Sequence, residues 1–192
     1  GGSVGESPLP FTHPFRPMPF VLRDGARIHW RTDGAPGAPA LLLANSLGTD
    51  LSLWDPVIPQ LARHFHVIRF DKRGHGASEV PPGMTEWTIE ALARDALAVA
   101  DAAGAQRFAY AGISIGGMIG VWLGANAPER LTRLVLSNTS AEMPAAGWAD
   151  RIAAVRANGM AGLVDGVMQR WFTDAYRTHA DATFQTVREH FL

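Results

Sequence analysis

The segment "AYAGISIGGMIG" (residues 109–120) decides the fold of this chain, because it joins a strand pattern to a sharp turn. It lies in an uncharged window from Phe108 to Pro128 that is long enough to cross a bilayer. The window begins with β-type residues, breaks at a glycine and continues with glycines at every fourth position. Such glycines occur in membrane helices, but they also let a helix lie close against a sheet. We therefore interpret the window as a strand, a turn and a helix.

Ser114 lies between Gly112 and Gly116 and completes the pattern G-x-S-x-G at the predicted turn. In this strand–turn–helix context the pattern is typical of a strained nucleophile elbow. The glycines leave room for the turn, and the serine hydroxyl is raised beside the positive end of the next helix. The alternative is a chance pentapeptide in a glycine-rich linker.

Outward from this segment, strand and helix patterns alternate. Asp24-Gly25 predicts a hairpin, and Ile89 to Ala100 show helical spacing, with Thr88 as N-cap and Gly104 as the stop. The other predicted helices are 53–63 and 115–127, and the predicted strands are 19–22, 26–32, 38–46, 66–74, 107–114 and 131–139. This alternation predicts an α/β fold, a mostly parallel sheet with helices on both faces.

After about residue 142 the strand signal disappears. An apolar helical face follows, made by Leu163, Val164, Val167, Met168 and Trp171. We predict a core over residues 18–141 and a helical cap or lid over 142–192. Residues 1–17 are interpreted as an extended arm or a cloning remnant, and they show no signal-peptide pattern, so a cytoplasmic location is expected.

Composition excludes several classes of function. Hydrophobic residues make up 47% and charged residues 18%, which is typical of a globular protein. The net charge of −1 and the lack of a basic block argue against binding to nucleic acid or to an acidic membrane. The sequence has no cysteine, which excludes disulfides, a cysteine nucleophile and thiolate metal sites.

A serine nucleophile also needs donors for the oxyanion that forms on the substrate. The backbone N–H of Ile115, directly after the serine, is the first candidate. The second is expected from the loop "NSLGTD" (residues 45–50), where the N–H of Leu47 would face the top of the sheet. The alternative is a plain strand-to-helix turn that ends at Gly48.

The segment "DKRGHGAS" (residues 71–78) is the other dense motif. His75 lies between two glycines, and we interpret it as a structural residue of a tight loop, not as a catalytic base. Asp71 and Arg73 are expected to fix this loop by a charge-assisted bond.

These motifs resemble the α/β-hydrolase fold. The stretches "NSLGTDLSLWDPVIPQLARHFHVIRFDKRGHGAS", "GISIGGMIGVWLGANAPERLTRLVLSNTS" and "WADRIAAVRANGMAGLVDGVMQRWF" are similar to those of 3-oxoadipate enol-lactonases of the β-ketoadipate route for aromatic degradation. The resemblance implies that Ser114 attacks a lactone carbonyl, that Leu47 and Ile115 hold the oxyanion, and that the helical segment covers the pocket. It implies neither a metal nor an organic cofactor.

The substrate implied by the resemblance carries a carboxylate, so arginines of the cap are expected to meet it. The substrate-binding candidates are Trp148, Arg151, Arg156 and Arg170. The alternative for each arginine is a solvated helix face.

The acid and the base of a triad are missing from the positions where this fold supplies them. They should follow Ser114 in the order acid, then histidine. Asn138 cannot act as an anion, Glu142 comes late, and the later histidines, His179 and His190, lie in predicted cap helices. We therefore expect that the last strands are absent and that this chain is the larger part of an enzyme. A missing C-terminal fragment or a second copy would then be its partner.

Two further hypotheses remain open. One is another α/β-hydrolase: a carboxylesterase, a C–C bond hydrolase or a cofactor-free haloperoxidase. The other is a non-catalytic binding module with this fold, against which the intact elbow argues. The enol-lactonase and carboxylesterase hypotheses place a small lactone or ester in the pocket.

Overall fold

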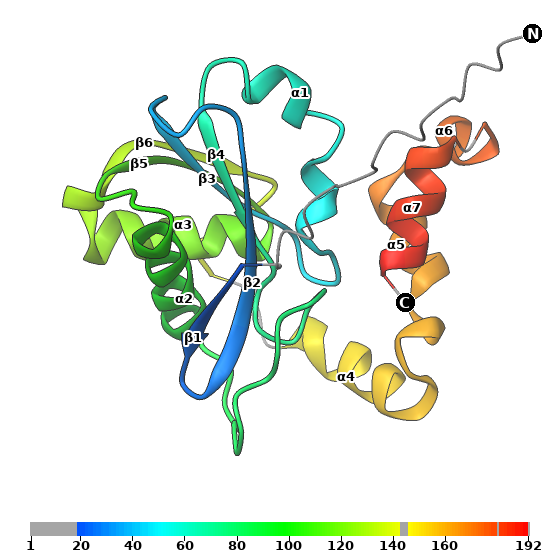
Figure 1. The fold of residues 1–192 in the computed structure, drawn as a ribbon. Coiled ribbons are helices and arrows are strands. Elements are labelled where there is room, and N and C mark those ends of the chain that lie inside the picture. The colour runs from blue at the N-terminus through cyan, green and yellow to red at the C-terminus, as the bar shows by residue number, and fades with distance from the viewer. Residues whose placement is uncertain (1–18, 143–145, 180, 192) are drawn as a thin grey trace, which may run out of the picture.

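The computed structural model describes residues 19–142, 146–179 and 181–191 (Figure 1). The predicted arm of residues 1–17 lies outside them. Six strands form one sheet in the order β1-β2-β4-β3-β5-β6. The strands β3, β4, β5 and β6 are parallel, whereas β1 and β2 join antiparallel at one side, so the predicted mostly parallel α/β sheet is confirmed. The bounds are β1 (Phe20–Arg23), β2 (Ala26–Asp33), β3 (Ala40–Ala44), β4 (His66–Phe70), β5 (Phe108–Ile113) and β6 (Leu131–Ser137).

The first two strands form the predicted hairpin. Asp24 and Gly25 have φ values of 51° and 81°, so both turn residues adopt the left-handed conformation that a two-residue hairpin requires. Strand β2 then pairs with β4 and connects the hairpin to the parallel part of the sheet.

Apolar side chains cover both faces of the central strands. On one face, Leu42, Ile68 and Tyr110 pack in a buried cluster with α2 (Ile89–Ala102) and α3 (Ile115–Asn126). On the other face, Leu41, Leu43 and Val67 pack against α1 (Ile58–Leu61). Figure 1 shows this layering, with helices on both faces of the sheet. Burial on both faces explains why these strands are continuous apolar runs.

Helix α2 has the boundaries that its sequence predicts. The Thr88 hydroxyl accepts a hydrogen bond from the Ala91 N–H at 3.1 Å, which is an N-cap contact. Gly104 follows the helix with φ 74°, and only glycine adopts this conformation without strain.

The single helix predicted over 53–63 is wrong. The structure has a short 3-10 helix η1 (Leu51–Trp54) and then α1, which is only one turn long. Pro56 and Pro59 interrupt the segment, because proline has no N–H to donate to the preceding turn. The predicted strand 66–74 also ends earlier, at Phe70, since the chain turns and Gly74 takes φ 72°.

Beyond β6, the described residues form helices and no strand. They are α4 (Ala146–Asn158), η3 (Met160–Gly162), α5 (Val164–Trp171), α6 (Asp174–Thr178) and α7 (Ala182–His190), here called the helical segment. The segment has an apolar cluster of its own, made by Val164, Val167, Met168, Phe184 and Phe191. Figure 1 shows these helices grouped on one side of the sheet.

Strand β6 is the exposed edge of the sheet. Leu134, Val135 and Leu136 are 39%, 59% and 41% exposed, unlike the apolar residues of the central strands. An exposed apolar edge strand offers unpaired backbone groups to a further chain.

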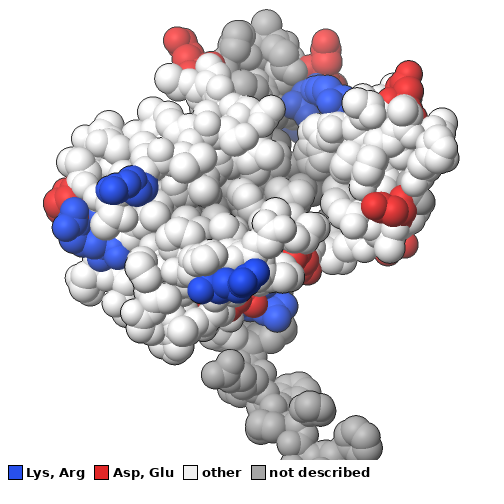
Figure 2. Space-filling view, turned by 90° about the horizontal axis from the view of Figure 1, so that it is seen from above, with Lys and Arg blue, Asp and Glu red and all other residues white. Residues whose placement is uncertain are grey.

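None of the helices in the described part of the chain has both the length and the apolar character needed to cross a membrane. On the face seen in Figure 2, basic and acidic side chains are scattered, and no continuous patch of one charge is visible.

Candidate active site

Ser114 lies on a sharp turn between β5 and α3. It has φ 57° and ψ −119°, a conformation that residues with a side chain rarely adopt. Such strain costs about 1–3 kcal/mol and occurs mainly at functional sites. The neighbouring β6 holds the turn, because the Ser114 N–H donates to the Ser137 carbonyl at 3.0 Å.

Two glycines make this turn possible by close backbone approach. A Cβ at Gly112 would overlap the backbone of Gly116, and a Cβ at Gly116 would overlap the carbonyl group of Ala44 in β3. Neither neighbour is the flexible end of a side chain, so neither can move aside. The G-x-S-x-G pattern therefore has a steric reason at both glycines.

Leu47 and Ile115 line the same pocket as Ser114, a cavity of about 400 Å³ that we call the Ser114 pocket. Within the described residues, neither the Leu47 nor the Ile115 N–H donates a hydrogen bond. The Ile115 N–H is free because it belongs to the first turn of α3. Two free backbone donors beside a strained serine are what an oxyanion hole requires.

The loop that carries Leu47 is held by its own side chains. The Thr49 hydroxyl donates to the Ser46 carbonyl at 2.8 Å, and the Asn45 amide donates to the Thr49 carbonyl. Lys72, for which the sequence motifs predict no role, reaches the same loop from the end of β4. Its ammonium group donates to the Ser46 carbonyl at 2.9 Å. The one sequence feature that could have drawn attention to Lys72 is that it is the chain's only lysine.

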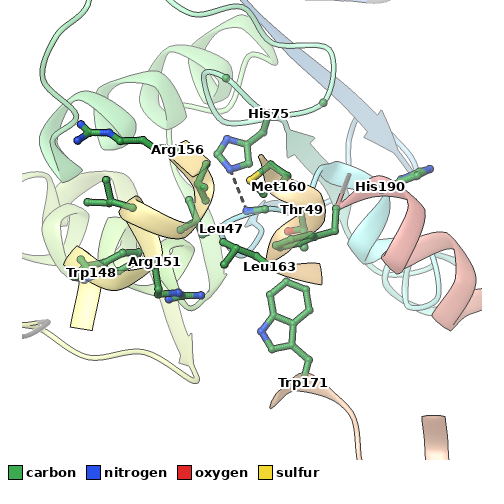
Figure 3. Close-up of a pocket in the computed structure, with 16 residues that line it drawn as sticks. Leu47, Thr49, His75, Trp148, Arg151, Arg156, Met160, Leu163, Trp171 and His190 are labelled. Carbon is green, nitrogen blue, oxygen red and sulfur yellow. Dashed lines mark hydrogen bonds between the residues drawn. The ribbon is translucent and has the colours of Figure 1, made fainter. Parts of the chain in front are cut away.

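His75 also supports this loop. Its Nε2 accepts a hydrogen bond from the Gly48 N–H at 3.1 Å, the dashed line in Figure 3, while Nδ1 lies 3.2 Å from the Arg73 carbonyl. Burial, together with the charge of Lys72, lowers the pKa of His75 to about 4. A neutral imidazole with both nitrogens engaged in backbone contacts is a structural group.

Asp71 and Arg73 both make charge-assisted bonds, with different partners. The Asp71 carboxylate accepts from the Leu51 N–H at 2.7 Å and the Ala77 N–H at 3.0 Å. The Arg73 guanidinium pairs with the buried Asp95 at 2.6 Å and 2.5 Å. The loop is thus fixed to the 45–51 region by Asp71 and to α2 by Arg73.

Trp148, Arg151 and Arg170, from the helical segment, line the Ser114 pocket. The Arg151 guanidinium lies 5.1 Å from the centre of the Trp148 ring. Burial, followed by the neighbouring Arg170, lowers the pKa of Arg151. In the described part of the chain, neither arginine forms an ion pair with a carboxylate. Arg156 lines a different cavity, and Figure 3 shows its guanidinium directed away from Leu47 and Leu163.

The described residues that line the Ser114 pocket include no histidine and no carboxylate. His190 hydrogen-bonds through Nδ1 with the Ser52 hydroxyl at 2.7 Å and faces Asp50 at 3.0 Å. His179 contacts the Ala175 carbonyl at 2.9 Å. Asn138 is in the pocket lining, but its amide cannot serve as the triad acid.

A second cavity of about 740 Å³ adjoins the Ser114 pocket and shares Leu47, Trp148, Arg151 and Trp171 with it. Its further lining from the helical segment is largely apolar and includes Ile152, Val155, Met160, Leu163 and Phe191. We call it the apolar cavity, and Figure 3 shows it between the 45–49 loop, His75 and the helical segment.

Comparison with known proteins identifies the protein family to which this chain belongs. Residues 39–190 match the alpha/beta hydrolase fold family, and the chain belongs to this family. The predicted α/β-hydrolase fold is therefore confirmed.

Particular relatives include enol-lactonases. Two 3-oxoadipate enol-lactonases of Acinetobacter baylyi are 36% identical over 80% and 78% of this chain. A hydrolase structure from Pseudomonas aeruginosa PA01 is 44% identical with a TM-score of 0.84 over 91% of the chain. The enol-lactonase structure from Burkholderia xenovorans LB400 is 40% identical with a TM-score of 0.85 over 90%. The chain spans 57% and 55% of the two Acinetobacter proteins, and 66% and 67% of the two solved chains.

Proposed function

We propose that this chain provides the nucleophile, the oxyanion hole and the substrate pocket of a serine hydrolase that opens 3-oxoadipate enol-lactone. One observation carries the proposal. A strained serine and two backbone N–H groups, which have no acceptor among the described residues, line one pocket, as the chemistry of acyl transfer requires. The similarity to enol-lactonases supports the choice of a lactone.

In the proposed reaction, the Ser114 hydroxyl oxygen attacks the lactone carbonyl carbon and a general base takes the hydroxyl proton. The N–H groups of Leu47 and Ile115 stabilise the negative charge on the former carbonyl oxygen. The ring C–O bond then breaks, and the enol oxygen leaves as an enolate that ketonises. Water hydrolyses the acyl-enzyme and releases 3-oxoadipate. These steps use no metal and no organic cofactor.

Arg151 and Arg170 are proposed to bind the substrate carboxylate, with Trp148 beside them. Both guanidinium groups line the Ser114 pocket, and the repulsion between them is relieved when an anion enters. Arg156 is a weaker candidate because it lines the apolar cavity and not the Ser114 pocket. In this proposal, residues 18–141 are the catalytic core and residues 142–192 are the lid.

The base and the acid are proposed to come from groups that the Ser114 pocket does not contain among the described residues. The exposed apolar edge of β6 supports this, since it can pair with a further strand. A C-terminal segment or a second copy would be the partner. Sedimentation and chemical denaturation of the isolated chain test this point. Self-association or marginal stability is expected, and a stable monomer with a sharp reversible unfolding transition contradicts it.

The function is tested by enol-lactone hydrolysis in two forms of the protein. One is the 192-residue chain alone, and the other is a fusion with the part of the Burkholderia enol-lactonase that this chain does not match. We expect little turnover from the chain alone, because a serine without its base loses most of its rate enhancement. We expect turnover from the fusion, and its loss in Ser114→Ala. Near-normal turnover by the chain alone contradicts the external base, and activity that survives Ser114→Ala contradicts the nucleophile.

The apolar cavity favours a second candidate, a carboxylesterase. A cavity of about 740 Å³ beside the Ser114 pocket can hold an aliphatic arm that 3-oxoadipate enol-lactone lacks. Hydrolysis of nitrophenyl esters of increasing chain length by the fusion tests this candidate. A kcat/KM that rises about fourfold per methylene supports it. A preference for the anionic lactone over every neutral ester excludes it.

A further inference from the structure

Lys72 is the one lysine among the 17 basic residues of the chain, and it is buried. It lies just beyond the end of β4, and only 1% of it is exposed. Its ammonium group faces three backbone carbonyl oxygens: those of Ser46 at 2.9 Å, Asn45 at 3.3 Å and Thr49 at 3.4 Å. All three belong to the loop that carries Leu47.

The residue type fits this position. An ammonium group is compact and directs three N–H donors at three acceptors, whereas the planar guanidinium group of arginine needs more space. Every other basic residue of the chain is an arginine, so lysine stands only where three carbonyl groups converge. Burying a charge without a hydrogen-bonded carboxylate is unfavourable for folding, so stability alone does not account for Lys72.

The bond from Lys72 determines the direction of the Leu47 N–H. The Ser46 carbonyl and the Leu47 N–H belong to one peptide unit, and no described peptide bond is cis. In a trans peptide unit the C=O and the N–H point in opposite directions. Lys72 therefore holds the carbonyl from inside the protein and leaves the N–H facing away from it. The next N–H, that of Gly48, is already used by His75.

We propose that Lys72 is a positioning residue of the oxyanion hole, which holds the Ser46–Leu47 peptide unit so that its N–H is presented to the Ser114 pocket. This inference rests on the proposed function of that pocket. A charged donor on the carbonyl also polarises the peptide unit, which makes the Leu47 N–H a better donor to an oxyanion.

The hydrogen bond from Lys72 to the Ser46 carbonyl is sensitive to pH, because burial lowers the pKa of Lys72 to about 7. The nearby carboxylates of Asp71 and Asp50 oppose this effect. His75, which is also close to Lys72, stays neutral above its own pKa of about 4. The ammonium form therefore prevails below neutrality, and the amine form, with one donor fewer, prevails at alkaline pH.

A test that needs no catalysis uses this single lysine. In the chain labelled with ¹⁵N and ¹³C at lysine, NMR shows one side-chain signal, whose shift gives the titration of Lys72. A second sample, labelled with ¹⁵N at leucine and isoleucine, shows the backbone amides of Leu47 and Ile115. We expect the Leu47 amide shift to follow the same midpoint, and the Ile115 amide, on the other side of the pocket, to remain unaffected. In Lys72→Met the Leu47 transition disappears. A Leu47 amide that does not respond at the Lys72 midpoint overturns the inference.

Kinetics of the fusion enzyme provide the second test. We expect Lys72→Met to lower kcat about 10- to 100-fold with KM changed less than about threefold, because the oxyanion forms only in the transition state. The wild-type rate should fall above the Lys72 midpoint, and the variant should lack this alkaline limb. Arg69→Met is the matched control, since Arg69 is a buried cation of β4 that contacts Asp33 and the Leu51 carbonyl and not the Ser46 carbonyl.

Equal losses of kcat in Lys72→Met and Arg69→Met overturn the inference, as does a Lys72→Met enzyme with the wild-type rate and pH profile. If no form of the protein shows Ser114-dependent hydrolysis, the proposed function fails. The NMR titration then still decides whether Lys72 orients the Leu47 peptide unit.

Discussion

The two halves of the proposed oxyanion hole, the Ile115 and Leu47 N–H groups, are held by different physical means. Behind Ile115, the Ser114 carbonyl accepts hydrogen bonds from the Met118 N–H at 3.1 Å and the Thr139 hydroxyl at 2.7 Å, both neutral donors. Behind Leu47, the Ser46 carbonyl accepts from Thr49 and from the ammonium group of Lys72. The first half depends on a strained backbone between glycines. The second depends on the Thr49 hydroxyl of the loop itself and on the ammonium group of Lys72, just beyond the end of β4.

This difference determines which changes, in pH or in side-chain volume, should disrupt each half. The elbow is set by steric contacts, so it should be insensitive to pH and intolerant of any added Cβ. The loop is set by Lys72 and His75, whose pKa values are both lowered by burial. It should tolerate small steric changes and respond to pH.

The largest expected effect comes from Gly116→Ala, which breaks the elbow. The added Cβ would overlap the carbonyl group of Ala44, and backbone on a central strand cannot move aside. We expect a loss of at least about 4 kcal/mol in the free energy of unfolding, or failure to fold, measured by urea denaturation.

Gly166→Ala is the matched control for this substitution. Gly166 lies inside α5, and a Cβ there meets nothing within 4 Å. We expect a gain of about 0.5–1 kcal/mol, because alanine is the better helix former. A Gly116→Ala protein that is as stable as Gly166→Ala would show that the elbow is not sterically determined.

An intermediate effect on the free energy of unfolding is expected when His75 is protonated at low pH. The pKa of His75 falls from 6.5 in the unfolded chain to about 4 in the folded protein, chiefly through burial. Between these values only the unfolded state binds the proton, so the free energy of unfolding decreases as the pH falls. The full contribution is about 3 kcal/mol.

Denaturation of wild type and His75→Gln between pH 7 and pH 4 measures this effect. The glutamine side chain can accept from the Gly48 N–H but does not titrate, so its stability should fall less over this range. Parallel curves for the two proteins would mean that His75 is not buried as a neutral group.

Lys72 affects stability at higher pH, since its pKa in the folded protein lies below its unfolded value of 10.5. Stability should therefore rise from pH 7 upward while the rate falls.

The smallest expected effect is the relief of strain at Ser114. Glycine adopts φ 57° and ψ −119° without a steric penalty. Ser114→Gly should raise the free energy of unfolding by about 1 kcal/mol, whereas Ser114→Ala keeps a Cβ and should not. Chemical denaturation compares the two variants. Equal stabilities would indicate that the serine conformation is not strained.

Much of the fold was predictable because its signals are local. The Asp24-Gly25 turn, the N-cap at Thr88 and the elbow at Ser114 each depend on a few neighbouring residues, and the structure has all three. The helix predicted over 53–63 failed, although its two prolines are themselves a local signal. The roles of Ser114, Leu47 and Ile115 stay predictions until they are tested in solution.

The tertiary contacts that hold the candidate site in place could not be predicted from the sequence. Nothing local connects Lys72 with the Ser46 carbonyl or Thr139 with the Ser114 carbonyl, because each pair is joined only when parallel strands align. The same holds for the arginines: Arg151 and Arg170 reach the Ser114 pocket, and Arg156 lines the neighbouring cavity.

The sequence by itself determined the elbow, since two glycines and one serine between strand and helix patterns leave few other conformations for the backbone. It also determined the alternating order that produces a mostly parallel sheet. Only the tertiary structure decided which N–H groups remain free for an oxyanion. That choice depends on hydrogen bonds between segments distant in sequence, and such bonds exist only once the sheet has brought the loops together.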